Sequence, residues 1–137
     1  MASAITGLDE GILQLDTGYH RTGLAACYVM IEDGRAAIFD TGVEHSVARI
    51  LCALEDEGLT SDDVEYVVPT HVHLDHAGGA GRLMQECRQA SMVIHPRGAR
   101  HMIDPAKLIA GAEAVYGREG LRNSVGEIVP VDEKRVI

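Results

Sequence analysis

The chain has 137 residues, a formal net charge of -9 and apolar side chains at 46% of its positions. This length suits one domain with a hydrophobic core and is short for two, so residues 1–137 are expected to form a single domain. The acidic charge disfavours nucleic acid or an anionic membrane as the main partner, because both carry negative charge themselves.

The sequence shows no sign of secretion or membrane insertion. Its first residues contain no basic segment followed by an apolar core, and no apolar run is long enough to span a bilayer. We therefore predict a cytoplasmic protein. Cys27, Cys52 and Cys87 are widely spaced and lie in apolar stretches, which favours small buried side chains over a disulfide or a catalytic thiol.

Short apolar runs predict strands along the whole chain. They lie at residues 12–15, 27–31, 35–40, 65–68, 92–94, 128–131 and 135–137. Asp33 and Gly34 separate the second run from the third, and this pair predicts a tight hairpin because glycine tolerates the positive φ that such a turn demands. The last run reaches the final residue, so we expect the domain to be interrupted there.

Apolar residues at helical spacing predict helices between these strands. Val47, Ile50 and Leu54 repeat at that spacing within residues 46–57, and Gly58 follows as a stop. Further helices are expected at residues 79–90, around His101, and from Pro105 to Gly117 with Asp104 as N-cap. Strands that alternate with amphipathic helices after a leading hairpin indicate an α/β domain with helices packed on a sheet.

A cluster of metal-ligand side chains follows the predicted strand at residues 65–68. His71, His73, Asp75 and His76 fall within six residues, a density that rarely arises by chance. Imidazole and carboxylate are good ligands for zinc, iron or manganese, and packing them together without a metal would require other partners for every polar atom. The sequence therefore predicts a metal-binding loop.

The spacing within this loop fits two metal ions. Residues two apart on extended backbone project to the same side, so His71 and His73 can clamp one ion. A turn into a helix can then bring Asp75 and His76 toward a second ion, while Gly78 and Gly79 let the backbone pass close to the site. Two ions about 3.5–4 Å apart can share a hydroxide and polarise a carbonyl or phosphoryl oxygen.

The loop resembles a known family signature. Residues 70–79 resemble the HxHxDH loop of the metallo-β-lactamase superfamily, and residues 39–42, Phe-Asp-Thr-Gly, resemble its earlier Asp-Thr-Gly element. The resemblance implies the N-terminal half of an αββα sandwich. It implies that His71 and His73 bind the first metal, that Asp75 and His76 bind the second, and that Asp75 acts as, or orients, the catalytic base. Asp40 would support the site without binding metal.

The family pattern also requires ligands that this chain does not provide. A third histidine, a bridging aspartate and a final histidine lie downstream in family members, whereas His95 follows the loop too soon to be that third ligand. We expect His20, His45, His95 and His101 to lie outside the site. The resemblance thus implies either self-association or a missing C-terminal half that supplies the remaining ligands.

The resemblance implies hydrolysis of a small-molecule substrate, with two divalent metal ions, zinc in the first place and iron or manganese as alternatives. Activated water would attack an ester, thioester or lactone in the complete protein. An iron-dependent oxidoreductase of the same fold, similar to a persulfide dioxygenase, is one alternative. A non-catalytic half-domain that binds metal or assembles with a second chain is another, and the acidic charge disfavours a nuclease of this superfamily.

Overall fold

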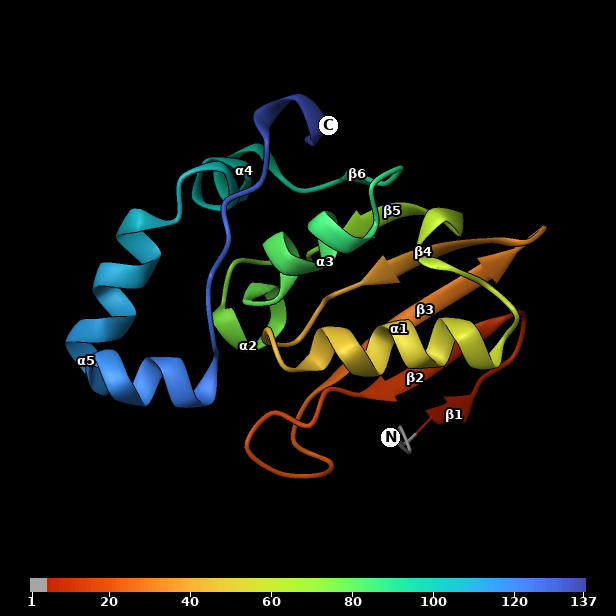
Figure 1. The fold of residues 1–137 in the computed structure, drawn as a ribbon, viewed down its shortest axis with the longest axis horizontal. Coiled ribbons are helices and arrows are strands. Elements are labelled where there is room, and N and C mark those ends of the chain that lie inside the picture. Colours follow the sequence, from red (N-terminus) through yellow and green to blue (C-terminus); the bar gives the residue numbers. More distant parts are fainter. Residues whose placement is uncertain (1–4) are drawn as a thin grey trace.

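The computed structural model describes residues 5–137 and forms one twisted six-stranded sheet against helices (Figure 1). The strands follow the order of the chain, with β1 to β4 antiparallel and β4, β5 and β6 parallel. Their bounds are Ile5–Gly7 (β1), Ile12–Asp16 (β2), Ala26–Glu32 (β3), Arg35–Phe39 (β4), Val64–Val68 (β5) and Ser91–Met92 (β6). The predicted α/β class is confirmed; β1, only three residues long, was not predicted.

The β3–β4 hairpin forms where Asp33 and Gly34 predict it. Glu32 pairs with Arg35, and the two turn residues have φ of 51° and 74°, as a two-residue hairpin turn requires. The crossover to parallel strand β5 runs through α1 (Ser46–Asp56), which confirms the first predicted helix, and through the short 3₁₀ turn η1 (Ser61–Asp63).

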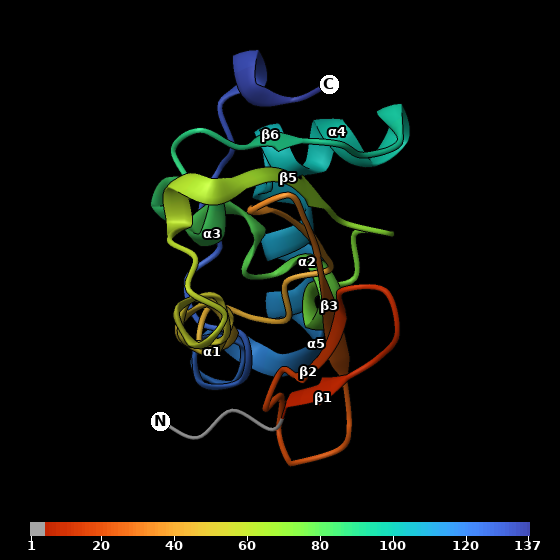
Figure 2. The same ribbon diagram turned by 90° about the vertical axis from the view of Figure 1, so that its right-hand side faces the viewer.

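The core lies between the sheet and helices α1 and α3 (Ala80–Glu86), which pack on the same face (Figures 1 and 2). Leu15, Val29 and Ile38 point from the strands into this layer and are fully buried, because alternate residues of a strand project to the same face. Ile50 and Leu83 meet them from the two helices, also fully buried. This packing fixes the position of the loops that leave β4 and β5.

The remaining helices continue beyond β5 and β6. They are α2 (Leu74–Ala77), α4 (Pro96–Ile103), α5 (Ala106–Ser124) and the short 3₁₀ turn η2 (Glu133–Arg135). Asp104 accepts a hydrogen bond from the backbone N–H of Ala106 at 3.2 Å, but the N-cap of α5 is Pro105, so the predicted N-cap lies one residue too early. No helix in the described part of the chain is long and apolar enough to cross a membrane.

Of two predicted helix ends, one differs in the structure and one agrees with it. The helix expected at residues 79–90 ends at Glu86, and the carbonyls of Met84, Cys87 and Ala90 instead accept hydrogen bonds from the Arg135 guanidinium at 2.6, 2.6 and 2.9 Å. The helix expected to close at Gly117 does so, because that glycine has non-helical φ of 75° and ψ of 161°; a second helical arm, which was not predicted, follows it within α5 to Ser124.

The C-terminal strands were predicted wrongly. Within residues 5–137 no strand forms at 128–131 or 135–137, and only Val136 makes an isolated bridge, to Met92. The strand expected at 92–94 is also shorter, ending at Met92. Val131 is nevertheless buried, and its N–H donates to Met102 at 2.9 Å. The apolar side chains at residues 128–131 therefore pack across α3 and α4 and do not pair in the sheet.

Candidate metal centre

The candidate ligands lie where parallel strands β4 and β5 end. The carboxyl ends of neighbouring parallel strands meet at one edge of a sheet, where open α/β folds bind their ligands. Asp40 directly follows β4, and its N–H donates to Val68, the last residue of β5, at 3.0 Å. Its φ of 64° is unusual for a residue with a Cβ atom, which marks a conformation held by its surroundings.

The Asp40 carboxylate anchors the loop after β5. It accepts the backbone N–H of Thr70 at 2.8 Å, and the Thr70 hydroxyl lies 3.0 Å from each carboxylate oxygen. His76 Nδ1 lies 3.1 Å from Asp40 Oδ2, and His71 Nδ1 lies 2.8 Å from the Thr70 hydroxyl. One buried carboxylate therefore organises two of the predicted ligands, one directly and one through a hydroxyl group.

This network determines which ring nitrogen of each histidine can bind metal. A carboxylate only accepts hydrogen bonds, so a neutral His76 donates from Nδ1–H. Thr70 has a single hydroxyl proton, which it donates to Asp40, so its oxygen accepts from His71 Nδ1–H. Both rings are then left with their lone pair on Nε2. A carboxylate or hydroxyl partner of this kind commonly fixes the tautomer of a metal-binding histidine.

The donor positions fit a divalent ion. His76 Nε2 lies 3.4 Å from Asp75 Oδ2. Two ligand atoms about 2.0–2.1 Å from one tetrahedral metal lie about 3.4 Å apart, so this pair needs almost no movement to share an ion. The imidazole and carboxylate set also matches the ligands that zinc, iron and manganese accept.

The histidine rings gather on one side of the loop. The ring centroids of His71 and His73 are 4.9 Å apart, and those of His71 and His76 are 4.5 Å apart. Within residues 5–137, one group of three side chains has ligand atoms all within 4.8 Å of one another: Asp40, His71 and His76. That group contains Asp40 and omits His73 and Asp75. The network above explains the difference, since Asp40 reaches His76 through Nδ1, the nitrogen turned away from Asp75.

The backbone behind the loop is tightly packed. The N–H and hydroxyl of Thr41 donate to the carbonyl of His76 at 2.8 and 3.0 Å, and Gly79 N–H donates to Gly42 at 2.9 Å. A Cβ atom on Gly79 would lie 2.6 Å from the carbonyl oxygen of Val43. The absence of a side chain at this glycine therefore lets the start of α3 lie against the segment after β4.

The other histidines have separate surroundings. His95 Nδ1 accepts the N–H of Arg97 at 3.1 Å and caps α4, while the His20 ring lies beside the Tyr19 ring, tilted by 52° with centroids 4.1 Å apart. His45 precedes α1 and His101 lies within α4. None of these four belongs to the clustered group found among residues 5–137.

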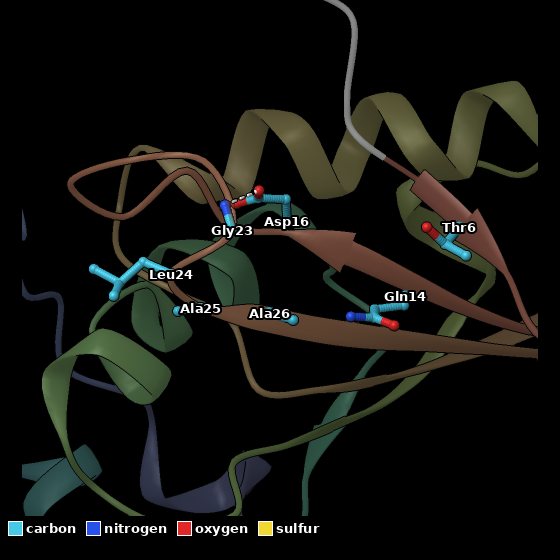
Figure 3. A pocket seen from close by; sticks show the side chains of 7 residues that line it. All are labelled: Thr6, Gln14, Asp16, Gly23, Leu24, Ala25 and Ala26. Atoms are coloured by element: carbon cyan, nitrogen blue, oxygen red, sulfur yellow. Dashed lines mark hydrogen bonds between the residues drawn. The ribbon is translucent and has the colours of Figure 1, made fainter.

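The β2–β3 loop reaches this end of the sheet and is held by Asp16. The carboxylate accepts the N–H groups of Gly18 at 2.8 Å and Gly23 at 2.6 Å, and Figure 3 shows the second of these bonds beside a cavity of about 240 Å³. The Gly18 hydrogen bond in particular lowers the pKa of Asp16. Burial raises the pKa of Tyr19 on this loop, and the nearby Asp75 and Tyr116 raise it further.

Sequence reasoning missed Thr70 and the far side of the site. Thr70 connects Asp40 to His71, and only its position next to a histidine hinted at this role. Leu121 and Val125 of the α5 region line a cavity together with His73 and Asp75. Leu121 and Val125 reach this cavity because α5 bends, and the sequence pattern did not predict that bend.

Comparisons with known proteins agree with this geometry. A model of the metallo-beta-lactamase superfamily matches residues 20–135, so the chain belongs to that superfamily. Among curated proteins, none matches.

Solved structures show the same fold. A metallo-beta-lactamase from Cronobacter sakazakii with a HARLDQ motif superimposes with a TM-score of 0.65 at 21% identity, covering 93% of this chain and 43% of that one. MEM-A1, a subclass B3 metallo-beta-lactamase from a soil metagenome library, superimposes with a TM-score of 0.63 at 17% identity, covering 72% of this chain and 35% of that one. Rm3 metallo-beta-lactamase superimposes with a TM-score of 0.63 at 20% identity, covering 74% of this chain and 36% of that one. The chain thus spans less than half the length of these structures.

Proposed function

We propose that His71, His73, Asp75 and His76 bind two divalent metal ions, zinc in the first place, and that the complete protein is a metal-dependent hydrolase. Its substrate would be a small molecule with an ester, thioester or lactone bond. The observation that carries this proposal is the Asp40 network, which leaves Nε2 of both His71 and His76 available and puts His76 Nε2 3.4 Å from Asp75 Oδ2.

Each side chain has a distinct role in this proposal. His71 and His73 hold one ion, and His76 and Asp75 hold the other. Bound at this site, the ions would supply a water of lowered pKa and polarise the carbonyl of the substrate. Asp75 orients that water or accepts its proton. Asp40 fixes the tautomers of His71 and His76 without binding metal itself.

The remaining ligands come from outside residues 1–137 in this proposal. The chain spans 33 to 45% of the solved structures it matches, so a longer chain or a second copy would complete both coordination spheres. Four ligands from one loop can retain metal in the absence of the others, and this part of the proposal can be tested on the chain itself.

Hydrolysis is tested on p-nitrophenyl esters, thioesters and lactones with the zinc-loaded protein in its complete form, in which a longer chain or a second copy supplies the remaining ligands. We expect turnover that His76→Ala and Asp75→Asn abolish and that His95→Ala leaves unchanged, because His95 caps α4 away from the cluster. Turnover that survives in both loop variants would contradict the proposal. Oxygen uptake by iron-loaded protein with a persulfide, without hydrolysis by the zinc form, would favour the oxidoreductase instead.

The supporting role of Asp40 has its own test. Asp40→Asn keeps the shape of the side chain but can present an N–H to His76, which reverses the donor pattern. We expect zinc affinity to fall about 10- to 100-fold, the usual effect of losing such a partner. Histidine ¹⁵N spectra of the metal-free protein should report Nδ1–H tautomers for His71 and His76 in the unaltered chain. Nε2–H tautomers there would contradict the assignment.

A further inference from the structure

A cavity of about 370 Å³ lies directly beside the ligand loop. Its size falls within the range of small-molecule sites. The lining residues come from the β2–β3 loop, from α2 with its N-cap, and from the α5 region: Tyr19, His73, Leu74, Asp75, Tyr116, Leu121 and Val125. Two of the proposed metal ligands therefore form one end of this cavity.

The side chains of this cavity are arranged by polarity. Leu121 and Val125 are 4% and 3% exposed and form an apolar floor with Val43, against which Tyr19 and Leu74 pack. Tyr116 is 61% exposed and stands at the rim. Apart from the two phenol groups, the polar atoms on these side chains belong to His73 and Asp75.

The bend in α5 makes this arrangement possible. Tyr116 and Leu121 are five residues apart, and in a straight helix residues three or four apart share a face whereas residues five apart do not. Gly117 lies between them with φ 75° and ψ 161°, a backbone region open essentially to glycine alone. Figure 1 shows the two arms of α5 meeting at an angle. The bend brings both side chains to one cavity.

We propose that this cavity binds the aliphatic acyl side of the substrate, with the scissile carbonyl at the His73 and Asp75 end. This inference rests on the proposed hydrolase function and specifies its substrate. None of the described side chains that line the cavity is Lys or Arg, and Leu74, Leu121 and Val125 offer no partner to a charge, so a neutral chain fits this part of the cavity better than a phosphate or carboxylate. The apolar floor and the two aromatic rings stabilise such a chain by removing it from water.

Binding can be measured without turnover and without metal. The probe is 2-octanone, which keeps a carbonyl and an aliphatic chain but has no leaving group, and acetone is the short-chain control. The chain has four tyrosines and no tryptophan, so the emission comes from Tyr19 and Tyr116 in the cavity and from Tyr28 and Tyr66 away from it, without indole background. We expect saturable quenching by 2-octanone and none by acetone at the same concentration.

Two neighbouring residues provide matched variants. Tyr116→Ala removes the rim of the cavity, and we expect about tenfold weaker binding of 2-octanone, with Tyr19 remaining as reporter. Val115→Ala alters the adjacent residue, which is 74% exposed and does not line the cavity, and should leave binding unchanged. Gly117→Ala should also weaken binding, because alanine disfavours this φ although no atom lies within 4 Å of its Cβ.

The outcomes separate the two proposals. Equal binding in the Tyr116→Ala and Val115→Ala variants, or no binding by the unaltered chain, would overturn the acyl cavity. Intact 2-octanone binding without hydrolysis of octanoyl esters by the zinc form of the complete protein would support the cavity and contradict the hydrolase. With hydrolysis present, Tyr116→Ala should raise KM for octanoyl esters about tenfold and leave KM for acetyl esters unchanged.

Discussion

The two faces of the sheet are both largely apolar, yet only one is covered. On β3 and β4, Cys27, Val29 and Ile38 point toward α1 and α3 and have no exposed surface. From the opposite face of β3 and β5, Tyr28, Met30 and Tyr66 are 38 to 40% exposed. A solvated sheet face normally carries polar side chains in alternation with the buried ones. The composition of the outer face therefore fits a surface that is covered by a further layer.

Strand register makes the outer apolar side chains contiguous. Tyr28 pairs with Phe39, Met30 with Ala37, and Ala37 with Tyr66 across three neighbouring strands. Apolar side chains grouped in this way favour association. We expect that a second copy or the C-terminal half of a longer chain covers this face.

Truncating a side chain on each face of the sheet should give the largest difference in stability between the two faces. Ile38→Ala leaves a cavity beneath α1 and α3 and should lower the free energy of unfolding by about 2–5 kcal/mol. Met30→Ala on the neighbouring strand should change it by less than about 0.5 kcal/mol, because its side chain is partly in water already. Urea unfolding of both variants measures the contrast, and equal losses would contradict the one-sided core.

The covered side also depends on a close contact between α3 and the C-terminal segment. A Cβ atom on Gly81 would lie 1.7 Å from the carbonyl oxygen of Val129, so Gly81→Ala must push the two apart. We expect a loss of about 1–3 kcal/mol in thermal or urea unfolding. Gly111→Ala is the matched control, since it lies in α5 with open space around its Cβ and should stabilise by up to about 1 kcal/mol.

The thiol of Cys27 offers a test by pH on the inner face. Burial raises its pKa from 9.0 to about 12. Between these values the unfolded chain loses the thiol proton while the folded chain keeps it, so stability falls as pH rises from 9 to 12. We expect roughly 1 kcal/mol lost per pH unit in that window, measured by urea unfolding. Cys27→Ala should have a shallower decline, and an identical slope would refute the burial of this thiol.

Substitutions on the outer face should change self-association rather than stability. A Met30→Lys, Tyr66→Lys double variant places charges on the exposed side, and we expect self-association in sedimentation to fall while the unfolding free energy changes by less than about 0.5 kcal/mol per site. A monodisperse monomer of the unaltered chain would show that this face needs no cover.

Local signals predicted much of this fold. The Asp33 and Gly34 turn, the helical spacing from Val47 to Leu54 and the apolar run of β5 each depend on neighbouring residues, and each element forms. The predictions failed where distant contacts decide. Arg135 binds the carbonyls at the end of α3 from 45 to 51 residues away, and the apolar run at 128–131 packs across helices instead of joining the sheet.

The candidate site also has residues that local sequence predicts and residues that depend on distant contacts. His71, His73, Asp75 and His76 are close in sequence, so their gathering could be predicted from spacing alone. Asp40 was found only through a resemblance, because it is 36 residues from His76. The relay through Thr70 and the cavity wall formed by Tyr116 and Leu121 required the structure, since they depend on a hydroxyl position and on the bend at Gly117.

The most direct measurement is the zinc content per chain, by elemental analysis of purified protein, with His71→Ala, His76→Ala and His95→Ala alongside. We expect stoichiometric zinc in the unaltered chain and in His95→Ala, and a marked loss in the two loop variants, because only His71 and His76 are oriented by Asp40. Equal zinc in all four proteins, or none in the unaltered chain, would contradict a metal site at this loop.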